Sequence, residues 1–579
     1  MAEVLGIVTG VFQLIPLCSS GFIFIKDVVQ AKQKLSEQLI RIQNHHDNFH
    51  SWHEIWGPSE TRERKFKHYA QERPLSAKAV LRQLALYSRL FYDLKALERY
   101  GFKIDVGPPK NDHIQLVDDF HFETNADLSP HNIRRFEAKC NSNLALIKKI
   151  KFVLGKRDKD VDELIIRLQE YNEVLWRYGP PLEVARLDKG IYDNIGQVVA
   201  DQLKLFLGAC AREAESATDP RSAAKYRALA KMANFRSQVQ EASGHPQIFG
   251  ASSFRMADNY NVDSRGMSTM ALLYDYPQKG DHRVVLIEWI QNPQLSGRKR
   301  DTERLSLLLN VPKPDEMFVL DSYGILDDLQ RTKRLGLVLK PPVNVRANLP
   351  QPLPPGAISE RRMPISLRQL MKTRDSLDLG ARFDIAKKLV DTVHMIHAVD
   401  WVHKNIRASS VLFFPLGEID DTSSNRPSYT VYDFSRPFIT GFSNARSDDI
   451  PSGNDDFYDR SQTKEAHNLT LDYYQHPAKL NDPHVAYRRL FDLYSLGCVL
   501  LELALWTTVD KLIGRNHASK ETPYKFIRAL SLETRLDRMV GKIFADVIRD
   551  CIALGEKNAL DNPARFGTDI ASRLAQCVA

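Results

Sequence analysis

The sequence contains few cysteines, and none of them has the spacing of a metal site. Six are spread along 579 residues, at Cys18, Cys140, Cys210, Cys498, Cys551 and Cys577. No C-x-x-C pair or Cys/His cluster is present, so we expect reduced thiols in a cytoplasmic protein, with no metal and no cofactor. His45, His46 and His50 are predicted to belong to the polar face of a helix rather than to a metal site.

The chain also lacks a strong excess of charge of either sign. Its 80 lysines and arginines stand against 72 aspartates and glutamates, which leaves a net charge of +8. So small a difference between large totals does not predict nucleic-acid binding. Basic clusters at 64–67 and 148–151 have two interpretations: they are solvated helix faces, or they are surfaces for anionic membrane lipid.

Charge is absent altogether from residues 4–25, although 26% of the whole chain is charged. A helix that crosses a bilayer needs roughly 20 apolar residues, so this run is long enough. Four residues that disfavour helix interrupt it and make it marginal as a permanent span, namely Gly6, Gly10, Pro16 and Gly21. A secretory signal peptide fits poorly, because no basic residue precedes the run and no strong cleavage site closes it.

Two interpretations of residues 4–25 stay open. The helix is either a permanent part of a buried core, or it is sheltered in a bundle and inserts into a membrane when the bundle opens. In the second case the candidates for insertion are the large apolar side chains, namely Leu5, Ile7, Val8, Val11, Phe12, Leu14, Ile15, Phe22, Ile23 and Phe24.

From Val28 to about Phe235 the sequence predicts helices. Leu, Lys, Glu, Arg and Gln predominate, and apolar residues recur at spacings of three and four, for example over 81–97. Proline-containing breaks separate the helices at 57–58, 107–109 and 179–181. No alternation typical of strands is present, so we expect an antiparallel helical bundle.

The opening residues Met-Ala-Glu-Val-Leu-Gly-Ile-Val-Thr-Gly-Val-Phe, followed by this helical region, resemble a HeLo domain. HeLo domains are known from fungal heterokaryon-incompatibility and programmed-death proteins. The resemblance covers residues 1–235. It implies a helical bundle whose amino-terminal helix is released to perforate membranes.

Beyond the bundle the pattern changes from helices to strands. Short apolar runs with β-branched residues, at 284–287 and 335–339, are bounded by turn residues and predict strands. Helical periodicity returns at Leu367. Strands followed by helices predict an α+β domain at 261–579, and an irregular linker and hinge is expected at 236–260.

Several segments of this second domain resemble the landmarks of a protein kinase. Residues 402–412 have the outline of the catalytic loop, 491–502 match the D-x-x-S-x-G element, and 473–477 stand where A-P-E is expected. The resemblance implies a bilobal kinase-like fold, in which Asp492 braces the backbone of the catalytic loop. Its structural landmarks are His403, Phe442, Asp492 and Gly497.

The positions that perform kinase catalysis carry other residues. In the motif H-R-D-L-x-x-x-N the Asp accepts the substrate proton and the Asn binds magnesium. Asn405 and Ser410 stand there instead. Glu288 replaces the lysine of strand three, which holds the nucleotide's phosphates, and no G-x-G-x-x-G precedes it. An amide cannot accept that proton, and a carboxylate repels phosphate.

The magnesium-binding D-F-G motif fits the sequence in two registers. Residues 439–446 match the wider kinase pattern at more positions, and this register places Gly441 at the metal-binding Asp. The other register uses Asp433 and Phe434. We favour the first. The second would leave one carboxylate for a metal but would still lack the lysine and the catalytic base, so we expect the domain to be a pseudokinase and the protein not to be an enzyme.

A membrane-active bundle joined to an inactive kinase-like domain is similar in architecture to the mixed-lineage kinase domain-like protein of animals. This implies a pore-forming cell-death effector that moves from cytoplasm to membrane on activation. Its expected partners are anionic membrane lipid, further copies of the chain and an unknown upstream signalling protein, whose trigger acts through 446–472. Two alternatives stay open: a soluble signalling adaptor, and an atypical active kinase.

Overall fold

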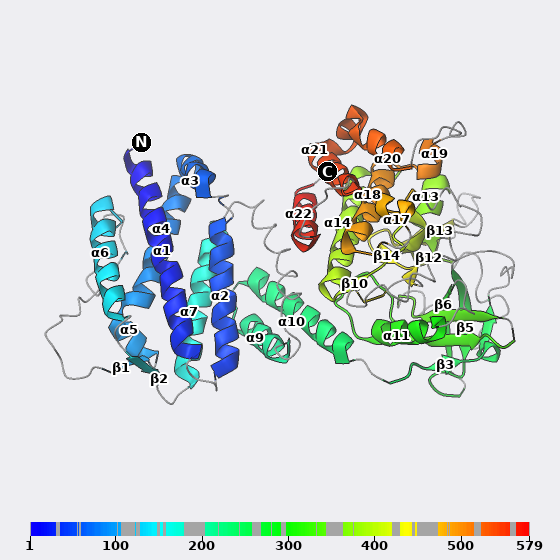
Figure 1. Ribbon diagram of the computed structural model, residues 1–579, viewed down its shortest axis with the longest axis horizontal. Coiled ribbons are helices and arrows are strands. Elements are labelled where there is room, and N and C mark those ends of the chain that lie inside the picture. Colours follow the sequence, from blue (N-terminus) through cyan, green and yellow to red (C-terminus); the bar gives the residue numbers. More distant parts are fainter. Residues whose placement is uncertain are drawn as a thin grey trace. The chain divides into compact units, whose positions relative to one another are not determined.

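A computed structural model describes most of residues 2–577. The description leaves out 31–34, 106–121, 123–127, 148–150, 155–157, 179–202, 257–267, 291–296, 343–362, 420–428, 443–445, 448–472, 514–522 and 556–562, with a few single residues and pairs between them. The chain forms two compact units, and the division between them falls at Asn234 and Phe235. The first is helical, and the second combines sheets with helices (Figure 1). A helical region followed by an α+β region is therefore confirmed.

Nine described helices build the first unit. They are α1 (Ala2–Gln30), α2 (Ser36–Glu54), α3 (Ser59–Glu72), α4 (Pro74–Tyr92), α5 (Leu94–Arg99), α6 (Pro130–Ile147), α7 (Asp158–Arg177), α9 (Leu203–Ser216) and α10 (Pro220–Glu241). The helix α1 lies among α2, α3, α4 and α6 (Figure 1). Apolar side chains of α1 to α7 form one continuous hydrophobic core, as expected for a bundle whose helices each bury one apolar face.

The prediction that this region lacks strands is wrong. β1 (Phe102–Asp105) and β2 (Lys151–Leu154) form an antiparallel ribbon in which Phe102 pairs with Leu154. Each strand is short, and its pairing partner lies far away in the sequence. Local periodicity does not report such pairing, because strand preference depends on cross-strand neighbours.

The helix α1 runs without a break through the four residues that were expected to interrupt it. Its glycines lie where neighbouring helices approach most closely. A Cβ atom on Gly10 would lie 2.9 Å from Leu81 Cδ1, and one on Gly21 would lie 2.2 Å from Phe91 Cδ2. These glycines therefore allow α4 to pack closely against α1. That packing outweighs their low intrinsic helix preference.

A six-stranded sheet begins the second unit, with strand order β3-β7-β8-β6-β5-β4. Its strands are β3 (Ile248–Phe249), β4 (Phe254–Met256), β5 (Ser268–Tyr274), β6 (His282–Trp289), β7 (Ser322–Asp328) and β8 (Arg334–Leu339). All neighbours are antiparallel except β3 and β7. Between β6 and β7 in the sequence comes α11 (Arg298–Asn310), which packs against β7 and β8.

The rest of the second unit is mainly helical, and short strands connect its parts. The helices are α13 (Leu367–Thr373), α14 (Leu379–Ala398), α17 (Pro477–Asn481), α18 (Arg489–Leu505), α19 (Val509–Ile513), α20 (Pro523–Leu532), α21 (Thr534–Ala553) and α22 (Pro563–Ala575). The strands are β9 (Ile365–Ser366), β10 (Trp401–Val402), β11 (Val411–Phe413), β12 (Pro415–Ile419), β13 (Tyr429–Tyr432), β14 (Phe438–Ile439) and β15 (Arg446–Ser447). α18 is buried from Leu490 to Ala504 and packs against α14 and α21.

The irregular linker expected at 236–260 is largely regular structure. α10 continues to Glu241, and residues 248–256 form β3, a 3₁₀ turn (Ala251–Ser253) and β4. β3 pairs with β7, and β4 pairs with β5. The Gly and Ser residues of this stretch mark a turn between two short strands, and a turn of that composition resembles a linker when its strands are too short to show alternation.

Candidate functional site

Three of the four residues that were predicted to be degenerate kinase positions, Glu288, Asn405 and Gly441, meet at the backbone of Gly441. Gly441 follows β14, and its N–H donates to Oε2 of Glu288 on β6 over 2.8 Å. Its carbonyl oxygen accepts a hydrogen bond of 2.9 Å from Nδ2 of Asn405, which lies between β10 and β11. Gly441 has a φ of +88°, a backbone conformation that glycine adopts without steric cost. Glu288 and Asn405 thus hold both polar backbone groups of Gly441.

Glu288 is buried, with 2% of its surface exposed. A buried carboxylate needs hydrogen bonds and a nearby positive charge. The Gly441 N–H supplies one hydrogen bond. Burial lowers the pKa of the Arg407 guanidinium, and the negative charge of Glu288 opposes that effect. Arg407 therefore contributes a positive charge to the surroundings of Glu288.

Ser410, the fourth degenerate position, closes a local turn. Its hydroxyl donates to the carbonyl oxygen of Arg407 over 2.8 Å and accepts from the Arg407 N–H over 3.1 Å. The carbonyl oxygen of Ser410 accepts hydrogen bonds from the N–H and the hydroxyl of Thr440. Ser410 therefore fixes the 3₁₀ turn Ala408–Ser410 and attaches it to the strand that leads into Gly441.

Asp492, in the first turn of α18, holds the backbone of the loop at 402–412. Its carboxylate accepts hydrogen bonds from the N–H groups of His403, over 2.7 Å, and Lys404, over 2.9 Å. The hydroxyl of Tyr487 donates to the same carboxylate. Burial by itself would raise the pKa of Asp492, but its bonds to His397 and His403 lower it below the ordinary value. Asp492 is therefore ionised, as a brace built on N–H donors requires.

The other kinase landmarks contribute to packing around this brace. The His403 ring contacts the Phe442 ring edge-on, with centroids 4.4 Å apart. Burial lowers the pKa of His403 to about 4, so its ring is neutral at neutral pH. Gly497 allows α18 to approach α21, since a Cβ atom there would lie 2.6 Å from Cβ of Cys551.

The two segments that fit the D-F-G motif make different contacts. Gly441 and Phe442 contact Asn405 and His403. The carboxylate of Asp433 instead accepts hydrogen bonds from the N–H and hydroxyl of Ser435 in its own turn. The register that places Gly441 at the metal-binding position stays a prediction. Across the described ranges, no group of three His, Cys, Asp or Glu side chains is placed to hold a metal ion.

The insertion candidates of α1 divide into three groups by burial. Six are buried in the core, namely Ile7, Val8, Val11, Leu14, Ile15 and Phe22, while Phe12 and Phe24 are half-buried against it. Leu5 is 53% exposed and Ile23 is 48% exposed. Among the described helices, α1 is the one whose length and composition are sufficient to cross a membrane.

No protein-family model matches this sequence. No curated protein is significantly similar to it either. The resemblances to HeLo domains and to protein kinases therefore depend on the residues named above.

The exposed basic side chains predicted at 64–67 lie on α3, where Arg64, Lys65 and Lys67 are exposed while Phe66 is buried. Lys148, Lys149 and Ile150 of the second cluster lie outside the described residues, as does 448–472 of the segment proposed for the trigger. None of these segments is used in the description of the site.

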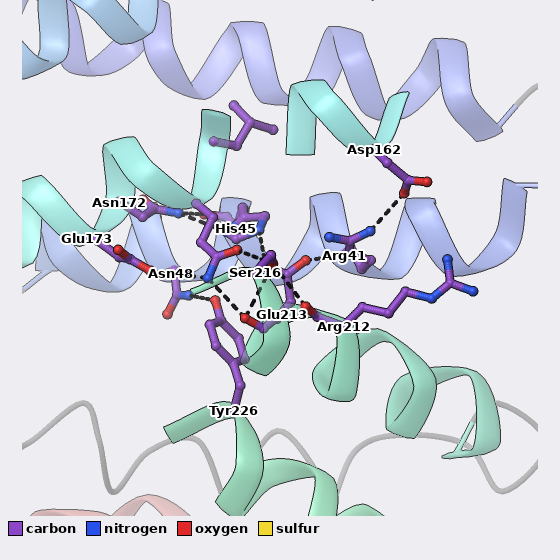
Figure 2. Close-up of polar contacts among 12 residues, drawn as sticks. Arg41, His45, Asn48, Asp162, Asn172, Glu173, Arg212, Glu213, Ser216 and Tyr226 are labelled. Atoms are coloured by element: carbon purple, nitrogen blue, oxygen red, sulfur yellow. Dashed lines mark hydrogen bonds and ion pairs between the residues drawn. The ribbon is translucent and has the colours of Figure 1, made fainter. Parts of the chain in front are cut away.

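Sequence reasoning missed a buried polar cluster in the first unit. The prediction that His45 belongs to a polar helix face is wrong, because His45 is fully buried and lies 3.0 Å from Oε2 of Glu213 (Figure 2). The two residues are on α2 and α9. Nothing in the local pattern around His45 indicates a carboxylate so distant in the sequence.

Proposed function

We propose that this protein is a regulated, pore-forming cell-death effector that acts at membranes. In this proposal an inactive, kinase-like second unit restrains the first unit until a signal arrives, and α1 then leaves the bundle and enters anionic membrane. The observation that carries the proposal is the burial, inside the helical first unit, of a membrane-length helix that has no charge over residues 4–25. The resemblance of the second unit to a kinase that lacks its catalytic residues supports the proposal.

The order of elements in the second unit supports a bilobal kinase-like fold. Antiparallel strands β4, β5 and β6 follow one another, and Glu288 lies on the third of them, the strand that carries the nucleotide-binding lysine in kinases. A helix, α11, comes next, where kinases place the helix whose Glu pairs with that lysine. Helices predominate after β8, and Asp492 braces the loop at 402–412.

The same site supports the absence of phosphoryl transfer. That reaction depends on a lysine and magnesium ions to neutralise phosphate charge, and on an Asp that accepts the hydroxyl proton. Glu288 brings a negative charge to the lysine position, and Asn405 uses its amide to hold Gly441. We therefore propose that the kinase-like unit serves as a structural switch. Its closed state is held by the hydrogen bonds of Glu288, on the sheet, and Asn405, in the loop at 402–412, to Gly441.

The packing of α1 supports a stored rather than a permanently inserted helix. Its apolar side chains are satisfied by other helices of the first unit. Hydrocarbon would satisfy them equally well, because the hydrophobic effect depends on removal from water and not on a particular partner. A helix with no charge over 4–25 therefore has two acceptable environments, and the free energy of the bundle decides between them.

Pro16 offers a test that leaves the bundle intact. It is exposed in the middle of α1, whereas Ile7 and Val11 are buried, so a charge placed at Pro16 does not enter the core. Pro16→Glu also removes a residue that costs about 3 kcal/mol inside a helix. In a bilayer the same Glu lies near mid-span and costs about 3 kcal/mol on insertion scales.

The experiment uses residues 1–241, since the first unit has its own hydrophobic core, together with the full chain. We expect residues 1–241 to bind and permeabilise phosphatidylserine vesicles, and the Pro16→Glu variant to bind poorly and release little dye. Pro16→Leu is the matched control and should keep its activity. Equal leakage from the Pro16→Glu variant, with an unchanged circular dichroism spectrum, contradicts insertion of α1.

One observation favours the adaptor alternative. Most apolar side chains of α1 lie in the core of the first unit, as in an ordinary soluble bundle. If residues 1–241 stay soluble, harmless to cells and inert toward vesicles, the adaptor is the better description. Magnesium-dependent ATP turnover by the full chain would instead favour an active kinase.

A further inference from the structure

A buried ion cluster joins α9 to α2 in the first unit (Figure 2). Glu213 of α9 is fully buried, and its Oε2 lies 3.0 Å from Nε2 of His45. The Nε–H of Arg41 donates to Oε1 of the same carboxylate. Arg41 also pairs with Asp162 of α7, at 2.8 Å. A carboxylate on one helix is thus held by two basic side chains, one turn apart, on another.

Neighbouring side chains fix the orientation of this cluster. Nδ2 of Asn172 lies 3.3 Å from Nδ1 of His45 and donates to the His45 carbonyl oxygen over 3.1 Å. An amide donor at Nδ1 makes that nitrogen the acceptor, so Nε2 carries the proton that His45 donates to Glu213. Gln169 donates to the carbonyl oxygen of Glu213 and accepts from Ser216. All polar groups named here belong to α2, α7 and α9.

This contact differs in kind from the packing of the other helices. The hydrophobic core of the first unit draws its described members from α1 to α7 and the segments between them, and from neither α9 nor α10. α9 does bury apolar side chains, including Phe206 and Cys210, but they are separate from that core. The contact of α9 with α2 therefore combines buried apolar side chains with the ion cluster. From α9 the chain continues into α10, within which the second unit begins at Phe235.

The helix α2 contacts α9 and α1 with different faces. Arg41 and His45 point to α9, while His46 and Phe49 contact the ring of Phe22 on α1, at 5.3 and 5.7 Å between centroids. Lys26 of α1 also donates to Gln43 of α2 over 2.9 Å. Loosening of α2 at its contact with α9 therefore directly affects the packing of α2 against α1.

The attachment of α9 to α2 depends on the charge of Glu213. Burial alone would raise the pKa of Glu213, but His45 and Arg41 lower it below the ordinary value, so the carboxylate is ionised. Loss of one member leaves the others buried and unpaired, which destabilises the fold far more than replacement of all of them together. When α9 separates, by contrast, every member regains water. Permanent helix contacts rarely need such a cluster, because apolar side chains of similar volume stabilise them as well or better.

We propose that Arg41, His45 and Glu213 form a releasable latch between α9 and α2, through which the connection to the second unit controls the cover over α1. The latch is independent of the membrane activity, while its effect on α1 depends on the function proposed above. The latch has an open state, with α9 detached and its charges hydrated, and a closed state, as in Figure 2.

Hydrogen exchange on the full-length chain, followed by mass spectrometry, tests the latch with three variants. Glu213→Gln keeps the size of the side chain and removes its charge, and we expect exchange in α9 and α2 to rise at least about tenfold, with α4 unchanged. Glu215→Gln makes the same change at an exposed position of α9 and should leave exchange unaltered. The triple variant Arg41→Met, His45→Leu and Glu213→Met replaces all three members of the latch by apolar volume and should keep α9 protected.

Unaltered exchange of α9 in the Glu213→Gln variant overturns the latch. If that variant loses helicity throughout the first unit, the triple variant decides. Protection of α9 equal to or above that of the natural chain supports the latch, because apolar side chains gain no hydration when α9 separates, and faster exchange of α9 contradicts it. Faster exchange in α9 and α2 with full protection of α1 supports the latch and overturns its control of α1. The membrane activity is tested separately by the Pro16→Glu variant, so failure of one proposal does not imply failure of the other.

Discussion

The carboxylate of Glu288 accepts a hydrogen bond of 2.8 Å from the backbone N–H of Gly441. If the proposed resemblance to kinases holds, the corresponding kinase positions are a lysine and an aspartate, which meet through the phosphates and magnesium of a bound nucleotide. In this protein Glu288 and Gly441 contact each other directly. This hydrogen bond joins the sheet to the segment after β14.

Glu288→Ala should loosen this junction. It leaves the Gly441 N–H without its carboxylate partner and removes a negative charge from the surroundings of Arg407. A lost hydrogen bond to a buried charged group costs about 1–3 kcal/mol, so we expect faster hydrogen exchange over 438–442. Glu316→Ala, at an exposed position in the same unit, is the control and should change nothing. Equal exchange in both variants would show that the contact does not hold the segment.

Gly441→Asp should not create a metal site, although it introduces the aspartate that the D-F-G motif has at this position. The residue has a φ of +88°, where a side chain costs about 1–2 kcal/mol, and the new carboxylate would stand on the residue whose N–H already binds the buried carboxylate of Glu288. We expect lower stability of the second unit and no effect of magnesium and ATP on its melting temperature. Gly441→Asn is the matched neutral variant, and it should be less destabilising because Asn tolerates positive φ. Stabilisation of the Gly441→Asp variant by magnesium-ATP would contradict this interpretation.

The sequence predicted the members of this site better than their contacts. Asn405, Gly441 and Asp492 could be located because motif order and spacing are local properties of the chain. The bond between Glu288 and Gly441 could not, because it joins a strand to a segment more than a hundred residues away and depends on the closure of the sheet against the rest of the unit.

Residues 4–25 show the same limit in the first unit. Lack of charge predicted an apolar helix, and α1 is one. Gly21 was expected to interrupt it, yet it is where Phe91 of α4 contacts the helix most closely. The role of a glycine in helix packing depends on its partner helix, which a single sequence does not identify. Glu213 was missed for the same reason, since its partners are on α2.

Gly21→Ala should push α1 away from α4. The added methyl group would lie 2.2 Å from the ring of Phe91, and overpacking of this kind costs about 1–3 kcal/mol. The change also makes α1 slightly more apolar. If the bundle restrains an insertion helix, the full-length variant should release more dye from phosphatidylserine vesicles than the natural chain, even though it is less stable.

Pro16→Glu provides the control for that result. Combined with Gly21→Ala it should abolish the extra leakage, because the charge opposes insertion without restoring the packing against Phe91. An adaptor predicts a different pair of outcomes, in which Gly21→Ala lowers the melting temperature and neither variant affects vesicles. Vesicle leakage measured beside thermal unfolding of the same samples therefore separates the two functions.

Two buried groups of the second unit should give its stability an unusual pH dependence. Glu502 accepts hydrogen bonds from the Tyr474 hydroxyl and the Val509 N–H, yet its burial raises its pKa to about 7 from 4.5. It destabilises the fold above pH 7, and this cost disappears as pH falls toward 4.5. Burial lowers the pKa of His403 from 6.5 to about 4, so this residue destabilises the fold as pH falls below 6.5.

Over pH 5–6.5 these two effects oppose each other, and Glu502→Gln should separate them. The amide oxygen keeps both hydrogen bonds, so we expect a gain of about 3 kcal/mol at pH 8, as a shift of this size implies. The variant should then lose stability steadily from pH 6.5 downward, because burial lowers the pKa of His403, and also of His397 and His476, and Glu502 no longer opposes them. Hydrogen exchange of α18 between pH 5 and 8 measures both changes. A pH profile parallel to that of the exposed-site control Glu316→Gln would show that Glu502 does not titrate in this range.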